Sequence, residues 1–166
     1  YEISKDEQDD FALKSQAKTQ LALEQNKFKD ELVEINIDNH LLDKDEHPRK
    51  NLKIEDLKKL ETVFRENGTV TPGNSSGIND GAAVLLLSEL EEAKKKSIKP
   101  LAKIVSWASV GVEPSLMGLG PIGAVKEALK KANWKLQDID LFEINEAFAA
   151  QSIAVIRDLN IDEDKV

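Results

Sequence analysis

The residues whose types could do chemistry gather in two glycine-rich turns and one short motif near the end of the sequence. The first turn, Thr71 to Gly81 (TPGNSSGINDG), offers hydroxyl and amide groups on a flexible backbone. It lacks the Gly-Lys-Ser/Thr ending of a phosphate-cradling loop. The motif, Asn145-Glu146-Ala147-Phe148, lies between an expected strand and an expected helix. An asparagine there is a common helix N-cap, and layered α/β enzymes bind ligands at the carboxyl ends of their strands.

The second turn, Gly111 to Gly123, allows an alternative based on dinucleotide binding. Residues 118–123 match G-x-G-x-x-G, and Asp140 and Glu143 follow at about the distance of a ribose-binding acid. The fingerprint places its first glycine directly after the strand, whereas residues 113–117 intervene here. Pro121 also removes a backbone N–H from the turn that would hold pyrophosphate. Titration with NAD would test this alternative.

Composition excludes several classes of protein. The formal net charge of −8 argues against nucleic-acid binding, because such proteins carry a basic face. The 166 residues contain no cysteine, so they offer no disulfide, no cysteine-ligated metal and no thiol nucleophile. His40 and His47 lie in a polar stretch and are expected to be exposed loop residues, so no metal site is predicted. No apolar run approaches about 20 residues, so no membrane span is expected.

Around these motifs the sequence predicts alternating elements. In the first half we expect a helix over 5–26, which a Ser4/Glu7 capping box opens, and a strand over 31–37. A charged irregular stretch should follow over 38–49. An amphipathic helix should then run from Ile54 to Phe64 and stop before Asn67-Gly68. In the second half we expect strands over 82–87, 101–112 and 141–144. A helix should follow each strand: a short one to Lys96 capped by Ser88 and Glu91, one starting at Pro121, and one over 146–159. This order favours a layered α/β fold.

Three stretches together, and in this order, resemble the thiolase family. They are 67–83 (NGTVTPGNSSGINDGAA), 104–123 (IVSWASVGVEPSLMGLGPIG) and 141–150 (LFEINEAFAA), and residues 1–16 also fit the family. The resemblance implies a partial thiolase fold, in which layered βαβ halves carry an inserted α/β loop domain. It assigns 1–78 to the second part of the coenzyme-A-binding loop domain, 79–100 to a returning strand and helix of the N-terminal half, and 101–166 to the start of the C-terminal half.

The resemblance also implies roles for single residues. Asn145 would be catalytic by holding a water that stabilises the enolate or oxyanion of the substrate thioester. Ser76 would hydrogen-bond the pantetheine arm of coenzyme A. The other implied binding residues are Pro72 and Gly73 along that arm, Met117 and Phe148 in the acyl and pantetheine pocket, and Arg49, Leu60 and Phe64 near the adenine end. On the residues alone, Leu60 and Phe64 could equally be core residues, Met117 a gap-filler and Arg49 a surface cation.

Thiolases are acyltransferases that work through an acyl-cysteine, with a second cysteine and a histidine handling protons. The resemblance implies that the nucleophile segment precedes Tyr1 and that the His/Cys segment follows Val166. The expected activity is that of an acetyl-CoA acetyltransferase: Claisen condensation of two acetyl-CoA to acetoacetyl-CoA, or thiolysis of 3-ketoacyl-CoA. The isolated chain is expected to be inactive.

An inactive coenzyme-A-binding or subunit-interaction fragment is the alternative. We expect acyl-CoA as substrate, no cofactor besides this thioester, no nucleic-acid or membrane partner, and homo-oligomers in the parent protein. A cytoplasmic location is expected, with mitochondrion and peroxisome open.

Overall fold

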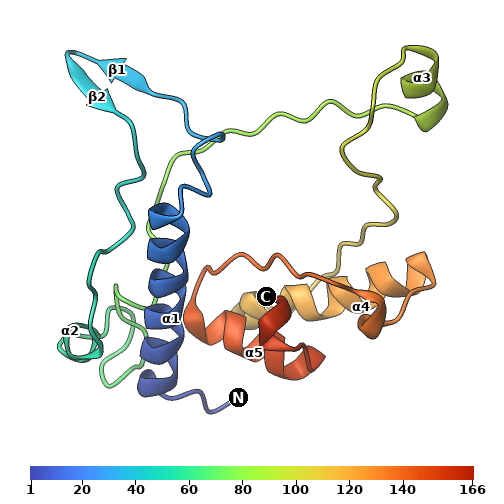
Figure 1. Cartoon of the computed structure of the whole chain (residues 1–166). Helices are drawn as coiled ribbons and strands as arrows, with labels where there is room; N and C mark the ends of the chain where they lie inside the picture. The colour runs from blue at the N-terminus through green and yellow to red at the C-terminus, as the bar shows by residue number, and fades with distance from the viewer. The chain divides into compact units, whose positions relative to one another are not determined.

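The computed structural model describes residues 1–166, which divide into two units (Figure 1). The first unit comprises residues 1–77 and 144–157, and the second comprises residues 78–143 and 158–166. None of the helices combines the length and apolar character that crossing a membrane requires. The predicted three-part domain division stays a prediction.

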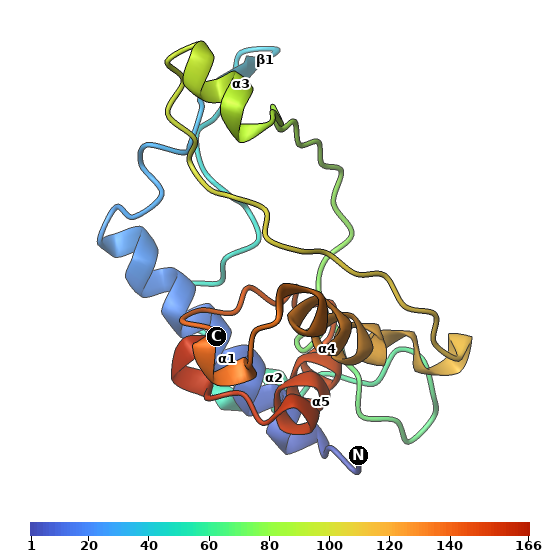
Figure 2. The same ribbon diagram turned by 90° about the vertical axis from the view of Figure 1, so that its right-hand side faces the viewer.

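The first unit is built around helix α1, Lys5–Glu24. Its predicted capping box is confirmed, because the Glu7 N–H donates to Ser4 Oγ at 3.2 Å and the Ser4 N–H donates to Glu7 Oε2 at 2.8 Å. These bonds satisfy backbone donors that the first turn of a helix otherwise leaves free. The helix ends before Asn26, which takes a left-handed φ of 55°. Figures 1 and 2 show α1, α2 and α5 side by side.

A small hairpin follows α1. Strand β1, Ile35–Ile37, pairs antiparallel with β2, His40–Leu42, so that Ile35 faces Leu42. The two residues between them, Asp38 and Asn39, have φ values of 50° and 65°. Positive φ at both positions defines a type I′ turn, whose twist matches that of the flanking strands. The predicted strand is therefore shorter than expected, and the prediction of irregular structure for 38–49 is wrong over β2.

Helix α2 covers only Ile54–Lys58, so the prediction that it reaches Phe64 is wrong. The chain turns back instead, because the Val63 N–H donates to Val70 O at 3.1 Å and Thr62 Oγ1 donates to Arg65 O at 2.9 Å. Leu57 of α2 is buried, and its carbonyl accepts a hydrogen bond from Lys5 Nζ at 3.1 Å. This bond ties α2 to the first turn of α1.

Helix α5, Ala149–Leu159, starts later than the predicted Glu146. Its first backbone bond runs from the Ser152 N–H to Phe148 O at 3.0 Å.

The interior of the first unit is unusually polar. Its fully buried larger side chains are Leu57 and Val155, together with the polar Gln8, Asp9, Thr71 and Ser152.

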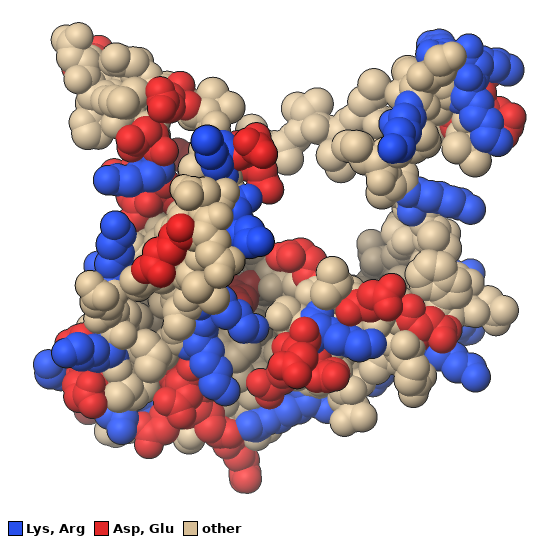
Figure 3. Space-filling view, viewed as in Figure 1, with Lys and Arg blue, Asp and Glu red and all other residues tan.

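The second unit contains α3 (Leu90–Lys95), the 3-10 helix η1 (Pro114–Leu119), α4 (Gly120–Ala132), and the 3-10 helices η2 (Leu136–Asp138) and η3 (Glu163–Lys165). Pro121 lies in the first turn of α4, as predicted, and Asn133 ends the helix with a left-handed φ of 56°. The predicted Ser88 cap of α3 is wrong, because Glu89 occupies the N-cap position without a side-chain hydrogen bond. Lys and Arg side chains gather over α3, at the upper right of Figure 3.

The three strands predicted for 82–87, 101–112 and 141–144 do not form. A β-strand needs a hydrogen-bonded neighbour, and no segment of this chain pairs with any of the three. Most of their apolar side chains are consequently open to solvent, with Val84 95% and Leu86 91% exposed, whereas Phe142 and Ile144 are half-buried. Figure 1 shows the chain before and after α3 as long segments without helix or strand. The segment 101–112 is held to α4 by a 2.8 Å hydrogen bond from Ser106 Oγ to Ala128 O.

Candidate functional site

The first glycine-rich turn and the Asn145–Phe148 motif lie against each other in the first unit. The Ser76 N–H donates to Ala147 O at 3.0 Å, and the Ala149 N–H donates to Asn74 O at 3.0 Å. Between these bonds Ser75 and Phe148 form an isolated antiparallel bridge. Two motifs that lie about 70 residues apart are therefore joined by backbone hydrogen bonds, whose geometry does not depend on flexible side chains.

An aromatic pair lies beside this junction. The rings of Phe64 and Phe148 meet edge to face, with centroids 6.0 Å apart and planes at 77°. Phe64 and Leu60 also line an open groove of about 680 Å³. Its other lining residues are Lys5, Lys58, Glu61, Thr62, Val63, Arg65, Glu66 and Asn67. The groove thus offers apolar surface and charges of both signs beside the Phe64–Phe148 pair.

Ser76 is exposed to solvent. Its backbone N–H is used by Ala147, whereas its hydroxyl makes no hydrogen bond within the chain. A hydroxyl both donates and accepts, so it is free to bind a polar group of a ligand.

The neighbouring Gly73 is tightly packed. A Cβ there would lie 2.5 Å from Leu57 Cδ2 and 2.6 Å from Leu60 Cδ1. Pro72, beside it, is exposed. The Pro72-Gly73 turn therefore runs close over α2 and the residue Leu60 that follows it.

Asn145 is exposed, and its side chain makes no hydrogen bond within the chain. It is not the N-cap of α5, because Phe148 stands at that position. The interpretation of Asn145 as a simple cap is therefore wrong. The carboxylate of its neighbour Glu146 accepts a 2.7 Å hydrogen bond from Ser15 Oγ of α1 through Oε2.

Two predicted site residues lie elsewhere. The Arg49 N–H donates to Gln16 Oε1 of α1 at 2.8 Å, and its exposed side chain makes no ion pair with another residue of the chain. Met117 lies on η1 in the second unit and is exposed. The structure thus brings together Ser76, Phe64 and Phe148, whereas Arg49 is held to α1 and Met117 belongs to the other unit.

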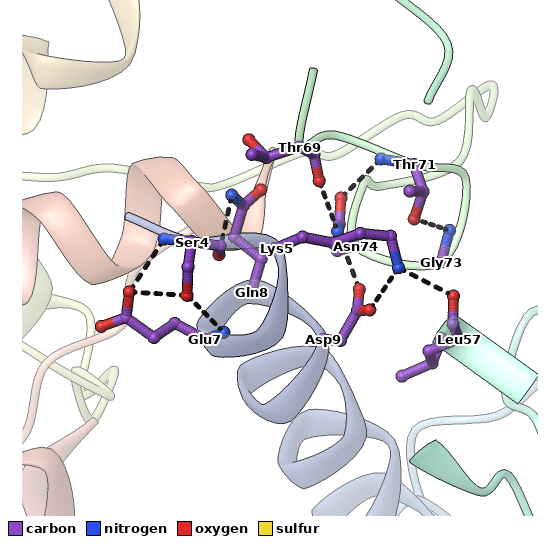
Figure 4. A network of polar contacts seen from close by, with 10 residues as sticks. All are labelled: Ser4, Lys5, Glu7, Gln8, Asp9, Leu57, Thr69, Thr71, Gly73 and Asn74. Carbon is purple, nitrogen blue, oxygen red and sulfur yellow. Dashed lines mark hydrogen bonds and ion pairs between the residues drawn. The ribbon is translucent and has the colours of Figure 1, made fainter. Parts of the chain in front are cut away.

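Sequence reasoning missed a buried polar network below the turn (Figure 4). The Asp9 carboxylate, 0% exposed, binds Lys5 Nζ at 2.6 Å through Oδ2 and Asn74 Nδ2 at 3.0 Å through Oδ1. Asn74 Oδ1 in turn accepts from the Thr71 N–H at 2.8 Å. The available signal was the KDEQDD start of α1, where polar residues occupy positions that the helix buries. No pattern in the sequence pairs Asp9 with Asn74.

Near the start of α1 a second ion pair joins the helix to α5. Arg157 hydrogen-bonds Glu7, and with the Ser4 N–H and hydroxyl it lowers the pKa of Glu7 from 4.5 to about 2. In the whole chain no three His, Asp or Glu side chains come together in a way that could hold a metal ion. Beside the charged groove, the Ser76 junction offers a free hydroxyl, the free amide of Asn145 and apolar groups, which suit a ligand with a polar, uncharged arm.

Comparison with known proteins places these motifs in a family. Residues 1–91 match the family description "Thiolase, N-terminal domain", and residues 98–166 match "Thiolase, C-terminal domain". The probable acetyl-CoA acyltransferase of Staphylococcus aureus (strain MSSA476) is 47% identical over 171 residues, covering 100% of this chain and 44% of the relative. The acetyl-CoA acetyltransferase of Shinella zoogloeoides is 48% identical over 166 residues, covering 98% of this chain and 42% of the relative.

Solved structures agree on the fold. A crystal structure of the Bacillus anthracis acetyl-CoA acetyltransferase superposes with a TM-score of 0.94 at 47% identity, covering 100% of this chain and 43% of that one. Human mitochondrial 3-ketoacyl-CoA thiolase, in complex with CoA, gives a TM-score of 0.92 at 44% identity, covering 98% of this chain and 41% of that one. The expectation of a partial thiolase fold of the α/β class is thus confirmed. The chain spans less than half the length of the relatives it matches.

Proposed function

Because the chain belongs to the thiolase family, we propose that its first unit binds the coenzyme A thioester of an acetyl-CoA acetyltransferase-type acyltransferase. The reaction is the Claisen condensation of two acetyl-CoA to acetoacetyl-CoA, or its reverse, thiolysis of a 3-ketoacyl-CoA. The names of the relatives support this class, since the bacterial proteins are called acetyl-CoA acyltransferase or acetyltransferase and the human one 3-ketoacyl-CoA thiolase.

The observation that carries the proposal is the backbone junction of Ser76 with Ala147. It places an unused hydroxyl beside the motif that contains Asn145 and Phe148. In our proposal the Ser76 hydroxyl hydrogen-bonds an amide of the pantetheine arm, and Phe148 and Phe64 pack against the arm's apolar part. The human relative of known structure was solved in complex with CoA.

Asn145 supplies the catalytic contribution of this chain. Thioester chemistry places negative charge on a carbonyl oxygen, and an aimed hydrogen-bond donor stabilises that charge in the transition state. An exposed amide with no partner in the chain is free to fix a water for this purpose. The charge of the amide does not change during the reaction, so the water keeps its orientation.

The nucleophile is not among these residues, since the 166 residues contain no cysteine. An acyl-cysteine mechanism therefore needs a thiol from outside them, and we predict that the isolated chain does not turn over acetoacetyl-CoA. Turnover above background, with contaminating thiolase excluded, would contradict this prediction. Homo-oligomer formation and a cytoplasmic location of the whole protein stay predictions.

The test of the proposed function is titration of the chain with coenzyme A by calorimetry. Saturable binding is expected, and Ser76→Ala should weaken it about 2- to 10-fold, as the loss of one hydrogen bond implies. Ser88→Ala is the matched control, because that exposed serine lies outside the first unit and should leave affinity unchanged. Absence of binding, or equal affinities for the Ser76 variant and the wild type, would overturn the proposal. Binding of NAD instead would favour the dinucleotide alternative.

A further inference from the structure

Beneath the Ser76 turn lies a carboxylate that the proposed chemistry does not use. Asp9 is fully buried, and both of its oxygens are occupied, one by Lys5 Nζ at 2.6 Å and the other by Asn74 Nδ2 at 3.0 Å. A buried carboxylate is costly unless it is paired and hydrogen-bonded, so this arrangement needs both partners. Because Asp9 has no solvent access, it lies out of reach of a substrate at the surface.

Asn74 connects Asp9 with the candidate site. Its side chain donates to Asp9 and to Thr69 O at 3.2 Å, and accepts from the Thr71 N–H at 2.8 Å. Its own carbonyl accepts from the Ala149 N–H, which belongs to the first residue of α5. Its backbone N–H donates to Thr71 O at 3.2 Å, so every polar group of this 3% exposed residue is engaged. Figure 4 shows the bonds of its side chain. Asn74 fixes the conformation of the turn and its distance from the Asn145–Phe148 motif at once.

We propose that Asp9 and Asn74 are positioning residues for the coenzyme A thioester. Together they hold the Thr71–Ser76 turn against Ala147–Ala149, so that the Ser76 hydroxyl stays in register with Phe148. This inference rests on the proposed function. Neither residue touches substrate; they act through the Ser76 N–H bond to Ala147 and the Ala149 N–H bond to Asn74.

The arrangement dictates what each substitution does. Asn74→Asp places two carboxylates against each other, and Asp9→Asn leaves one oxygen for the two donors Lys5 and Asn74. The double variant Asp9→Asn/Asn74→Asp restores the bond with donor and acceptor exchanged. The amide introduced at position 9 donates to the carboxylate introduced at position 74, which still accepts from the Thr71 N–H. Lys5 keeps a hydrogen bond to the amide oxygen at position 9 but loses its ion pair, and a carboxylate oxygen now faces Thr69 O, so the double variant restores the Asp9–Asn74 bond and not the whole network.

The test uses the polypeptide encoded by the native gene and two measurements. The first is the Michaelis constant for coenzyme A in thiolysis of acetoacetyl-CoA. Each single variant should raise KM about tenfold with kcat changed less than about threefold, because the network holds the turn that carries Ser76 and makes no hydrogen bond with Asn145. The double variant should return KM to within about threefold of the wild type. Glu92→Gln, which removes an exposed ion pair on α3, is the control that should change neither constant.

The second measurement is amide hydrogen exchange followed by mass spectrometry. Peptides containing Ser76 and Ala149 should exchange at least about tenfold faster in the single variants, with α4 unaffected, and should regain protection in the double variant. Three results would overturn the inference. They are an unchanged KM in the single variants, a rise in exchange that is uniform over the chain, and a double variant whose KM and exchange are no closer to the wild type than those of the single variants. If a single variant fails to fold, a folded double variant supports the inference and an unfolded one overturns it. A wild type that binds no coenzyme A would instead overturn the proposed function, and exchange would still decide whether Asp9 and Asn74 hold the turn.

Discussion

The ring of Phe64 stands edge to face against the ring of Phe148, at a centroid distance of 6.0 Å. Phe64 belongs to the loop after α2, and Phe148 directly precedes α5. The aromatic pair therefore lies next to the hydrogen bond between the Ser76 N–H and Ala147 O. Such pairs contribute about 0.5–1.5 kcal/mol beyond the area they bury.

Replacing Phe64 with alanine should therefore cost only about 1 kcal/mol of unfolding free energy, since the ring is 70% exposed. Its larger effect should be on ligand binding, because Phe64 also lines the groove. Calorimetric titration should show a several-fold weaker affinity for coenzyme A. Leu21→Ala, an exposed apolar residue of α1, is the control, and equal affinities for the two variants would contradict the role of Phe64.

Asn145→Ala should impair catalysis without affecting folding. The side chain is exposed and makes no hydrogen bond in the chain, so the melting temperature should stay within about 2 °C. Loss of an oxyanion-stabilising group typically lowers kcat about 10²- to 10³-fold. Steady-state kinetics of the native-gene polypeptide, with Asn36→Ala as a surface control, measures this. A lowered melting temperature with normal kcat would assign Asn145 a structural role only.

Gly73→Ala should destabilise the first unit by about 1–3 kcal/mol. The added methyl group would lie 2.5 Å from Leu57 Cδ2, and Leu57 is 2% exposed and has no room to move. Gly81→Ala is the matched control, because a Cβ at Gly81 meets nothing within 4 Å. Urea denaturation of both variants should separate them, and equal midpoints would show that the Pro72-Gly73 turn yields easily.

Acid should remove the stabilising contribution of Glu7. Its folded-state pKa of about 2 lies below the unfolded value of 4.5, mainly because of the hydrogen bond from Arg157. A depressed carboxyl pKa contributes stability that is fully present above the unfolded pKa of 4.5 and is lost as the pH falls toward 2. The difference in denaturation midpoint between wild type and Glu7→Gln should shrink over that interval. Arg157→Gln should reduce the same pH dependence, and a constant difference would contradict the assignment.

The isolated chain should self-associate, because the exposed apolar segments 82–87 and 101–112 have no strand neighbour. Unpaired extended segments readily pair with other chains. Sedimentation velocity over a range of concentrations should show species larger than 18.5 kDa. Leu86→Lys should reduce the association, whereas a sharply monomeric chain at high concentration would refute the expectation.

The helices could be predicted better than the strands, for a physical reason. The starts of α1 and α4 are set by local chemistry, namely the Ser4/Glu7 capping box and Pro121, which a single stretch of sequence contains. A strand is a property of a pair, and the apolar run at 82–87 says nothing about whether a neighbour is present. Strand β2 was missed because its pairing depends on two left-handed residues, Asp38 and Asn39, which few sequence patterns reveal.

The candidate site was predictable only where its residues form motifs. Ser76 and Phe148 stand in recognisable stretches, and the structure brings those stretches together. Asp9 and Asn74 lie 65 residues apart, and their bond depends on burial that no local pattern encodes. For Asn145 the sequence motif indicates the functional role, but only the structure shows that Asn145 is not the N-cap of α5.

The long separation between α1 and its partners has a consequence for biosynthesis. Glu7 binds a residue 150 positions later and Ser15 one 131 positions later. At ribosomal speeds of about 5–20 residues per second, roughly 8–30 s pass between the synthesis of Glu7 and that of Arg157. The contacts of α1 with Glu146 and Arg157 must therefore wait until translation has passed α5, whereas the partners of Asp9, Lys5 and Asn74, are made earlier. A nascent chain halted before α5 would hold α1 through earlier residues such as Asn74 and Leu57 and leave its α5-facing side open to proteases and chaperones.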